Sequence, residues 1–349
     1  MQTSATVVQQ PLDLIRSVHV ERLGIMMEPE PGAASEVGGV LNPAAVRHTD
    51  GDLYLFPRLV ADGNYSRVGI ARACFDDGGD PVGVERLGLA LEPSADYELG
   101  EDGRGGCEDA RISFCEPLGC YVMSYVAFGR SGPRAALAMS ADLRIWRRQG
   151  LVEFDEQDGI AFAACDNKDV CIFPHLIEGS SSRSSIALLH RPHFQGAAGD
   201  SPAGIWISYA ALPADGDPGA VGTFTGHRFL AGPEQPWECL KIGCGTPPIL
   251  TRLGWLIVYH GVGGRDEDGC RTYSAGVMLL DTEDPARILY RSPDPVLRPE
   301  LPQEMSGVCA EVVFPTGIDA RPDLGDLVFD IYYGMADSRI GAARLTLEA

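Results

Sequence analysis

The sequence predicts an all-β protein, folded as a single five-bladed β-propeller. The chain of 349 residues contains 42 glycines and 25 prolines, a composition typical of many short strands joined by turns. A pattern of three strands also occurs five times along the chain. None of the five repeats could bury both faces of its own sheet, so we expect the repeats to pack on one another around a central channel.

Each repeat begins with a short strand that carries polar residues at its start. A glycine turn follows, then a second apolar strand that ends in Tyr, Arg or His, and then a third strand rich in Ala, Gly and Ile. The repeats begin at Asn42, Cys107, Asp166, Gly243 and Cys309. Their spacing exceeds the roughly 40–50 residues of common propeller repeats, so we expect long loops between blades. A β-sandwich is the alternative fold, but it leaves the equivalent polar positions of the five repeats unexplained.

We assign residues 36–349 to the propeller and residues 1–35 to an N-terminal extension. Within the extension, residues 11–18 are predicted to form a short helix or a strand that closes the fold. Residues 1–12 lack the basic stretch and apolar run of a signal peptide. We therefore expect a cytoplasmic protein.

The acidic composition excludes two classes of partner. A net charge of -21 repels nucleic acid and anionic membrane surfaces. No segment approaches the 18 or so uninterrupted apolar residues of a membrane span. In a chain this acidic, a cluster of Lys and Arg predicts a local site for an anion.

The ten cysteines predict free thiols rather than disulfides or a metal site. Disulfides are rare in intracellular proteins. No two cysteines have CxxC spacing, and no glycine-rich phosphate loop follows a strand. We therefore expect no metal and no organic cofactor.

The repeats predict where the functional residues converge, because the first strands of a propeller line its channel. The polar residues at the heads of the first strands are Asn42, Glu108, Asp109, Asn167, Lys168, Lys241 and Glu311. The residues at the ends of the second strands are Arg58, Tyr125, His190, Arg191, Tyr259, His260, Tyr332 and Tyr333, and Asp337 follows closely. We expect both sets to meet in one pocket.

Carboxylates, amides and aromatic rings in one pocket suit a polyhydroxylated ligand such as a sugar. Cleavage of a glycosidic bond needs a carboxylic acid and a nucleophile, which is either activated water or phosphate. Phosphate needs a cationic cradle rather than a base, and Lys168, Arg191 and Lys241, with His260 nearby, would form one.

Each of these residues also has a structural interpretation. Asp109 and Arg111 share a face of a strand and could form an internal ion pair. Lys168 could be a solvated loop residue, and His260 could be packed in a turn. The equivalent placement in five repeats favours the functional interpretation.

The chain resembles glycoside hydrolase family 130, the β-mannoside phosphorylases and related β-mannosidases, at these same residues. The resemblance covers about residues 20 to 345 in unbroken order. The matching segments are Asn42-Pro43-Ala44, Arg58, Glu108-Asp109-Ala110-Arg111-Ile112, Asn167-Lys168-Asp169 before Phe173-Pro174, His190-Arg191-Pro192, Lys241-Ile242-Gly243 before Pro247-Pro248, Tyr259-His260-Gly261, Val312-Val313-Phe314-Pro315, Tyr332-Tyr333-Gly334 and Asp337.

The resemblance implies an inverting phosphorylase, which converts a β-mannoside and inorganic phosphate to α-mannose 1-phosphate and a shortened sugar. The family's catalytic acid maps onto Asp109 and is expected to act through a sugar hydroxyl. The implied phosphate-binding residues are Lys168, Arg191, Lys241 and His260. The implied sugar-binding residues are Asn42, Arg58 and Asp337, to which the repeat pattern adds Glu108, Tyr125 and Glu311.

The sequence departs from the family at two positions. Ala110 stands where the family usually has Pro, which changes only local stiffness. Glu311 stands where an amide is expected, and a carboxylate there could activate water, so an inverting β-mannosidase is the alternative activity. A carbohydrate-binding propeller without catalysis is a third. Linkage, acceptor sugar and any homo-oligomer are left open.

The strand pattern also distinguishes between the two adjacent carboxylates. Successive residues of a strand point to opposite faces. We therefore expect Asp109, and not Glu108, to face the pocket squarely, with Arg111 on the same face holding the Asp109 carboxylate.

Overall fold

The computed structural model describes residues 14–178, 184–194, 203–212, 221–264 and 271–349, and this part of the chain is almost entirely β-structure. The all-β prediction is confirmed. Helical structure among the described residues is limited to short turns. These are α1 (Pro302–Met305) and the 3-10 turns η1 (Asp62–Asn64), η2 (Asp96–Glu98), η3 (Glu101–Gly103), η4 (Glu116–Leu118) and η5 (Pro236–Glu238).

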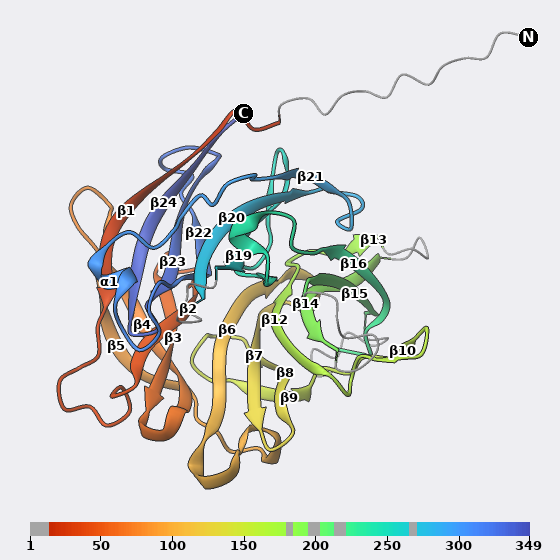
Figure 1. The fold of residues 1–349 in the computed structure, drawn as a ribbon, viewed down its shortest axis with the longest axis horizontal. Helices are drawn as coiled ribbons and strands as arrows, with labels where there is room; N and C mark the ends of the chain where they lie inside the picture. The colour runs from red at the N-terminus through yellow and green to blue at the C-terminus, as the bar shows by residue number, and fades with distance from the viewer. Residues whose placement is uncertain (1–13, 179–183, 195–202, 213–220, 265–270) are drawn as a thin grey trace, which may run out of the picture.

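Most strands fall into five antiparallel groups of four, which follow one another along the chain (Figure 1). The first comprises β2 (Gly39–Arg47), β3 (Leu53–Ala61), β4 (Tyr65–Phe75) and β5 (Pro81–Leu91). The second comprises β6 (Gly105–Cys115), β7 (Cys120–Gly129), β8 (Gly132–Ser140) and β9 (Arg147–Leu151). A short parallel pairing of β4 with β6 joins these two groups into one eight-stranded sheet.

The third group comprises β12 (Asp166–Ile172), β14 (Ser184–His193), β15 (Ile205–Ala211) and β16 (Thr225–Ala231). The fourth comprises β17 (Lys241–Cys244), β19 (Gly254–Gly263), β20 (Thr272–Leu280) and β21 (Ile288–Arg291). Short additional strands are β13 (Ile177–Glu178) on β14, β18 (Ile249–Thr251) on β19, and the hairpin of β10 (Glu156–Gln157) and β11 (Ile160–Ala161).

The fifth group combines the two ends of the described chain. It comprises β22 (Val313–Ala320), β23 (Val328–Met335), β24 (Arg339–Glu348) and β1 (Ser17–Met27), which pairs antiparallel with β24. The strand that was one of the two predictions for residues 11–18 is therefore observed from Ser17 onward, and residues 11–13 lie outside the described residues.

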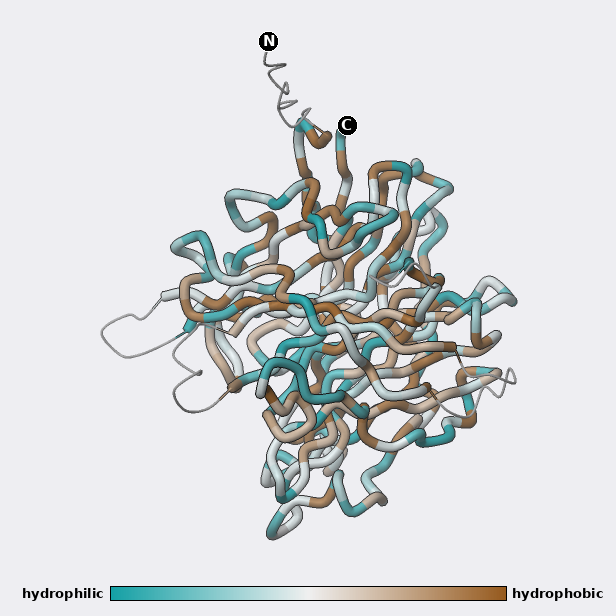
Figure 2. Tube along the Cα trace, turned by 90° about the vertical axis from the view of Figure 1, so that its right-hand side faces the viewer, coloured by the Kyte–Doolittle hydropathy of each residue, from teal (hydrophilic) through white to brown (hydrophobic). Residues whose placement is uncertain are grey.

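Hydrophobic clusters occupy the space between each group and the next. Phe56 and Met123 belong to the cluster between the first and second groups, and Leu137 and Leu188 to the one between the second and third. The third and fourth, the fourth and fifth, and the fifth and first groups share further clusters. Figure 2 shows hydrophobic segments along the strands and hydrophilic segments at the outer turns. Each group thus buries both faces only with its neighbours, as the repeats predict.

Candidate functional site

The heads of the inner strands share an irregular backbone. Asn42, Asp109, Asp169 and Glu311 all have positive φ, between 46° and 59°. Strands β2, β6 and β12 each shift register at this point, which is a β-bulge. A left-handed conformation at a residue other than glycine costs about 1–3 kcal/mol and tends to occur at functional sites. The repeated bulges give Asn42, Asp109 and Asp169 the same backbone conformation at equivalent places in three strand groups.

The bulge in β6 brings both neighbouring carboxylates to one arginine. Arg58 donates from Nη2 to Glu108 Oε1 at 2.7 Å and from Nη1 to Asp109 Oδ1 at 3.2 Å. Asn42 Nδ2 donates to Asp109 Oδ1 at 2.9 Å, and Lys168 Nζ lies 3.6 Å from Glu108 Oε2. We call these five residues the carboxylate cluster. The two carboxylates do not point to opposite faces as strict alternation predicts, because the bulge interrupts the alternation of the strand and both reach Arg58.

Electrostatics set Asp109 and Asp337 apart. Burial acts to raise the pKa of Asp109, but the positive charges of Arg58 and Arg111 outweigh it and hold the pKa below its ordinary value. Burial, together with the charge of Asp109, raises the pKa of Asp337 to about 6. Arg58 and Asp337 line one cavity of about 240 Å³. Two carboxyl groups with divergent pKa values beside a cavity are typical of a catalytic site.

A second group of charged residues surrounds Asp169, which is buried at the head of β12. Asp169 accepts a hydrogen bond from Arg191 Nε at 2.5 Å and lies 3.4 Å from Arg111 Nη2 and 3.6 Å from His260 Nε2. The terminal nitrogens of Arg191 make no hydrogen bond to the described residues. We call Asp169, Arg111, Arg191 and His260, together with Lys241, the cation cluster.

The side chains of Lys241 and His260 make no hydrogen bond to another described residue. Lys241 Nζ lies 5.3 Å from the centre of the Tyr273 ring, and neither ring nitrogen of His260 is hydrogen-bonded. Burial, then the charges of Arg191 and Arg271, lower the pKa of Lys241 to about 8. Burial also lowers the pKa of His260 to about 3, against the opposing charge of Asp169. A half-buried ammonium group beside a buried imidazole, neither with a partner among the described residues, favours an anionic ligand that can accept hydrogen bonds.

Arg111 has a different role from the predicted one. It donates from Nη1 to the backbone oxygen of Asp109 at 2.8 Å, not to the carboxylate, and from Nε to the oxygen of Gly245 at 3.1 Å. Its guanidinium also lies 5.6 Å from the centre of the Phe314 ring. Arg111 therefore ties the second, third, fourth and fifth strand groups together and fixes the bulge that carries Asp109.

The structure does not bring all of the expected residues to the pocket. Tyr125 is buried in the first hydrophobic cluster and donates a hydrogen bond to Glu98 at 2.7 Å. Tyr333 donates to the buried Glu304 at 2.9 Å. Asn167 and His190 bond to each other within the third strand group. These side chains lie on the faces of the strands that pack against neighbouring groups.

Glu311 lies apart from the carboxylate cluster. Its Oε2 accepts a hydrogen bond from Thr272 Oγ1 at 2.6 Å, and its backbone oxygen accepts one from the Tyr273 N–H at 3.0 Å. Tyr273 also stacks with His260. Glu311 therefore borders the cation cluster, on the side of the fourth strand group.

The sequence analysis did not assign a functional role to two members of the site, Asp169 and Arg271. Asp169 organises the cation cluster. Its position in the sequence could have indicated this role, because Asp169 is equivalent to Asp109: each directly follows another charged residue at the head of a strand. Arg271 lies close enough to Lys241 to lower its pKa. A further signal is composition, because Lys168 and Lys241 are the only two lysines of the whole sequence.

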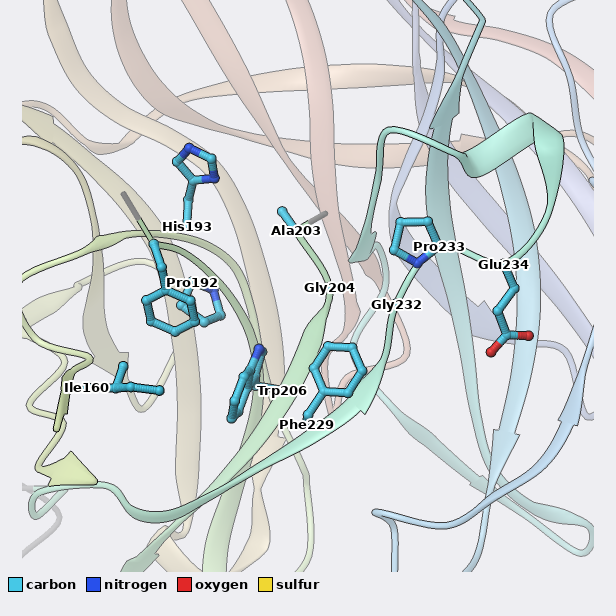
Figure 3. Close-up of a pocket in the computed structure, with 11 residues that line it drawn as sticks. Ile160, Pro192, His193, Ala203, Gly204, Trp206, Phe229, Gly232, Pro233 and Glu234 are labelled. Carbon is cyan, nitrogen blue, oxygen red and sulfur yellow. The ribbon is translucent and has the colours of Figure 1, made fainter. Parts of the chain in front are cut away.

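A larger cavity of about 630 Å³ lies beside the cation cluster. Pro192 and His193 line it and directly follow Arg191 on β14. Trp206 and Phe229 form one wall from neighbouring strands, with ring centroids 5.5 Å apart (Figure 3). Aromatic rings at the edge of a polar site provide surfaces on which a large ligand can lie.

The described residues contain no cluster of three or more His, Cys, Asp or Glu that could hold a metal ion. Eight cysteines within the described ranges are free thiols, namely Cys74, Cys107, Cys115, Cys120, Cys165, Cys171, Cys239 and Cys244. Among the helices of the same ranges, none is long and apolar enough to cross a membrane.

An all-β scaffold that places paired carboxylates next to a cation cluster is that of a carbohydrate-active enzyme. The model of a family described as beta-1,4-mannooligosaccharide phosphorylase matches residues 20–349. The chain belongs to this family, glycoside hydrolase family 130.

Named relatives agree with this assignment. The chain is 31% identical over 319 residues to a 1,2-beta-oligomannan phosphorylase of Thermoanaerobacter sp. (strain X514), which covers 90% of this chain and 92% of that protein. It is 32% identical over 246 residues to a beta-1,2-mannobiose phosphorylase of the same organism, covering 70% and 68%. The fold is similar to that of beta-1,2-mannobiose phosphorylase from Listeria innocua, with a TM-score of 0.71, 24% identity, and coverage of 94% and 96%.

Proposed function

We propose that this chain is an inverting β-mannoside phosphorylase, which converts a β-mannooligosaccharide and inorganic phosphate to α-mannose 1-phosphate and a shortened oligosaccharide. The observation that carries the proposal is the cation cluster. Arg191, Lys241 and His260 present nitrogens without hydrogen-bonding partners among the described residues, next to a cluster that holds the candidate acid. A hydrolase needs no such anion site, whereas a phosphorylase does. The names of the relatives support the same reaction.

In this proposal one set of residues binds phosphate and another binds the sugar, and Lys168 of the carboxylate cluster belongs to the phosphate set. Lys168, Arg191, Lys241 and His260 bind phosphate. Asn42, Arg58, Glu108 and Asp337 bind the mannosyl unit, Glu311 contacts the ligands from the side of the fourth strand group, and Asp109 is the acid. Tyr125 is not assigned to the sugar in this proposal, because its hydroxyl donates to the buried Glu98.

The proton balance explains how an acid of low pKa can work here. The phosphate dianion carries the one proton that the leaving sugar oxygen must gain when phosphate bonds to the anomeric carbon. Asp109 accepts a proton and passes it on through a sugar hydroxyl, so it ends each cycle in its starting state. A bound mannosyl unit also excludes water, which favours the neutral form of a buried carboxyl group.

The five strand groups are, we further propose, the blades of a five-bladed propeller that spans residues 36–349, with β1 completing the last blade. The five hydrophobic clusters, one for each pair of neighbouring groups, support this. We also propose a cytoplasmic location, which the eight free thiols among the described residues favour. A partner other than sugar and phosphate is not needed, and a net charge of -21 disfavours nucleic acid.

The decisive experiment incubates the protein with β-1,2- and β-1,4-linked mannobiose and mannotriose, each with and without phosphate. We expect mannose 1-phosphate of α configuration, formed only when phosphate is present. Release of free mannose at the same rate without phosphate would make the protein a β-mannosidase, with Glu311 as the suspected base. The relative rates on the two linkages identify the natural one.

A further inference from the structure

A line of buried hydrogen bonds crosses all four long strands of the third group. Asn167 on β12 lies 3.0 Å from His190 Nδ1 on β14, and His190 Nε2 lies 2.8 Å from Ser208 Oγ on β15. Ser208 Oγ lies 2.7 Å from His227 Nδ1 on β16, and His227 Nε2 lies 3.2 Å from the backbone oxygen of Asp155. The first four side chains are fully buried or nearly so. We call these five residues the polar ladder.

One order of donors and acceptors satisfies every contact in the polar ladder. Asn167 Nδ2 donates to His190 Nδ1, and His190 Nε2 donates to Ser208 Oγ. The Ser208 hydroxyl then donates to His227 Nδ1, and His227 Nε2 donates to the backbone oxygen of Asp155. Both imidazoles are neutral in this order, in agreement with the lowered pKa of His190, which results from its burial. The Ser208 hydroxyl is the one group that both accepts from one histidine and donates to the other.

The polar ladder lies where the backbone pairing of β12 with β14 is weakest. Asn167 pairs with Pro192, which has no N–H to donate, and the register shifts directly after the Lys168–Arg191 pair. Asn167 immediately precedes Lys168, and His190 immediately precedes Arg191. Side-chain hydrogen bonds therefore join the two strands at the one place where the strands present two cations of the proposed phosphate site.

We propose that Ser208 and His227 are positioning residues for phosphate. They touch no substrate, but through His190 and Asn167 they hold β12 and β14 in the register that sets the distance between Lys168 and Arg191. Removal of the central hydroxyl leaves two buried imidazoles without a common partner, which strains this end of the two strands. The inference rests on the proposed function, because it assigns phosphate to these cations.

The test compares Ser208→Ala with the wild-type protein by calorimetric titration of inorganic phosphate and by steady-state phosphorolysis. We expect the Kd and the KM for phosphate to rise about tenfold, the change that loss of about 1.4 kcal/mol of binding produces. The KM for the mannoside and kcat at saturating phosphate should stay within about twofold of the wild type, because the sugar binds to other strand groups.

Two further variants separate positioning from simple destabilisation. His227→Asn keeps an acceptor for the Ser208 hydroxyl and should retain near-normal phosphate affinity, whereas His227→Leu should behave like Ser208→Ala. Ser292→Ala is the matched control, since it removes a buried hydroxyl of the fourth strand group, which accepts a hydrogen bond from the Val277 N–H at 3.0 Å. It should lower the melting temperature without changing phosphate affinity.

The outcomes are distinguishable. If Ser208→Ala lowers the melting temperature as Ser292→Ala does and leaves phosphate affinity unchanged, the positioning role is refuted while the proposed function stands. The role is also refuted if the KM values for phosphate and mannoside rise in parallel. If the wild-type protein binds no phosphate and cleaves mannosides without it, the proposed function fails first and this inference fails with it.

Discussion

Replacement of Lys241 by methionine should separate ligand binding from stability more cleanly than any other change in the site. Lys241 Nζ makes no hydrogen bond or ion pair with a described residue, and it lies 5.3 Å from the centre of the Tyr273 ring. Its pKa is lowered to about 8, chiefly by burial, so the charged form is disfavoured in the folded protein. Methionine of similar length removes this penalty together with a cation–π contact of about 0.5–1 kcal/mol. A pKa drop from 10.5 to about 8 costs roughly 3 kcal/mol at neutral pH, which exceeds the lost cation–π contact, so we expect the free energy of unfolding to rise rather than fall.

Binding of phosphate should instead weaken. A hydrogen bond to a charged group contributes about 1.5–3 kcal/mol, which corresponds to about a ten- to hundredfold change in an equilibrium constant. The assay measures mannose 1-phosphate at saturating mannoside and varied phosphate, alongside thermal unfolding. Arg252→Met is the control, because Arg252 is an exposed cation whose Nε pairs with Asp326 at 2.8 Å. Equal phosphate KM values for Lys241→Met and the control would refute the assignment of Lys241 to phosphate.

Three further predictions concern the acid, the pH dependence and metal ions. Asp109→Asn should lower kcat by at least about a hundredfold with little change in mannoside binding. Glu108→Gln, which weakens the Arg58 contact, should mainly raise the KM for the mannoside. The reverse pattern would exchange the roles of the two residues. Phosphate affinity should fall as the pH rises through about 8, because Lys241 loses its proton there, and a Lys241→Met enzyme should lack this limb of the profile. Dialysis against a chelator should leave activity intact, and loss of activity that one added metal restores would contradict this.

The sequence pattern predicted several contacts that the structure shows, because the prediction depends on repeated strands rather than on detail. Equivalent polar residues in repeated strands had to meet if the repeats pack around a centre. The contacts of Asp109 with Asn42 and Arg58, three residues from two strand groups, follow from that reasoning. So does the approach of Lys168 to Glu108.

Side-chain directions at the bulges could not be obtained in the same way. Strict alternation placed Glu108 and Asp109 on opposite faces, but a positive φ at Asp109 turns both toward Arg58. Asn and Asp tolerate this conformation better than most residues, so the recurrence of Asn42, Asp109 and Asp169 was the available signal. Tyr125 was misplaced for a different reason: it keeps the alternation of β7, in which Tyr121, Met123, Tyr125 and Ala127 all belong to the first hydrophobic cluster.

The restriction of lysine to positions 168 and 241 has a practical consequence for chemical labelling. A reagent selective for amines has only these two side chains and the α-amino group to attack. Lys241, with a pKa of about 8, carries a substantial fraction of free amine at mildly alkaline pH. Acylation with a small activated ester would thus probe the proposed phosphate site without any sugar recognition element. Mass spectrometry could show directly whether phosphate protects the Lys241 peptide from acylation. By the same logic, coupling this protein to a solid support through its amines would block the very surface that an immobilised catalyst must leave open.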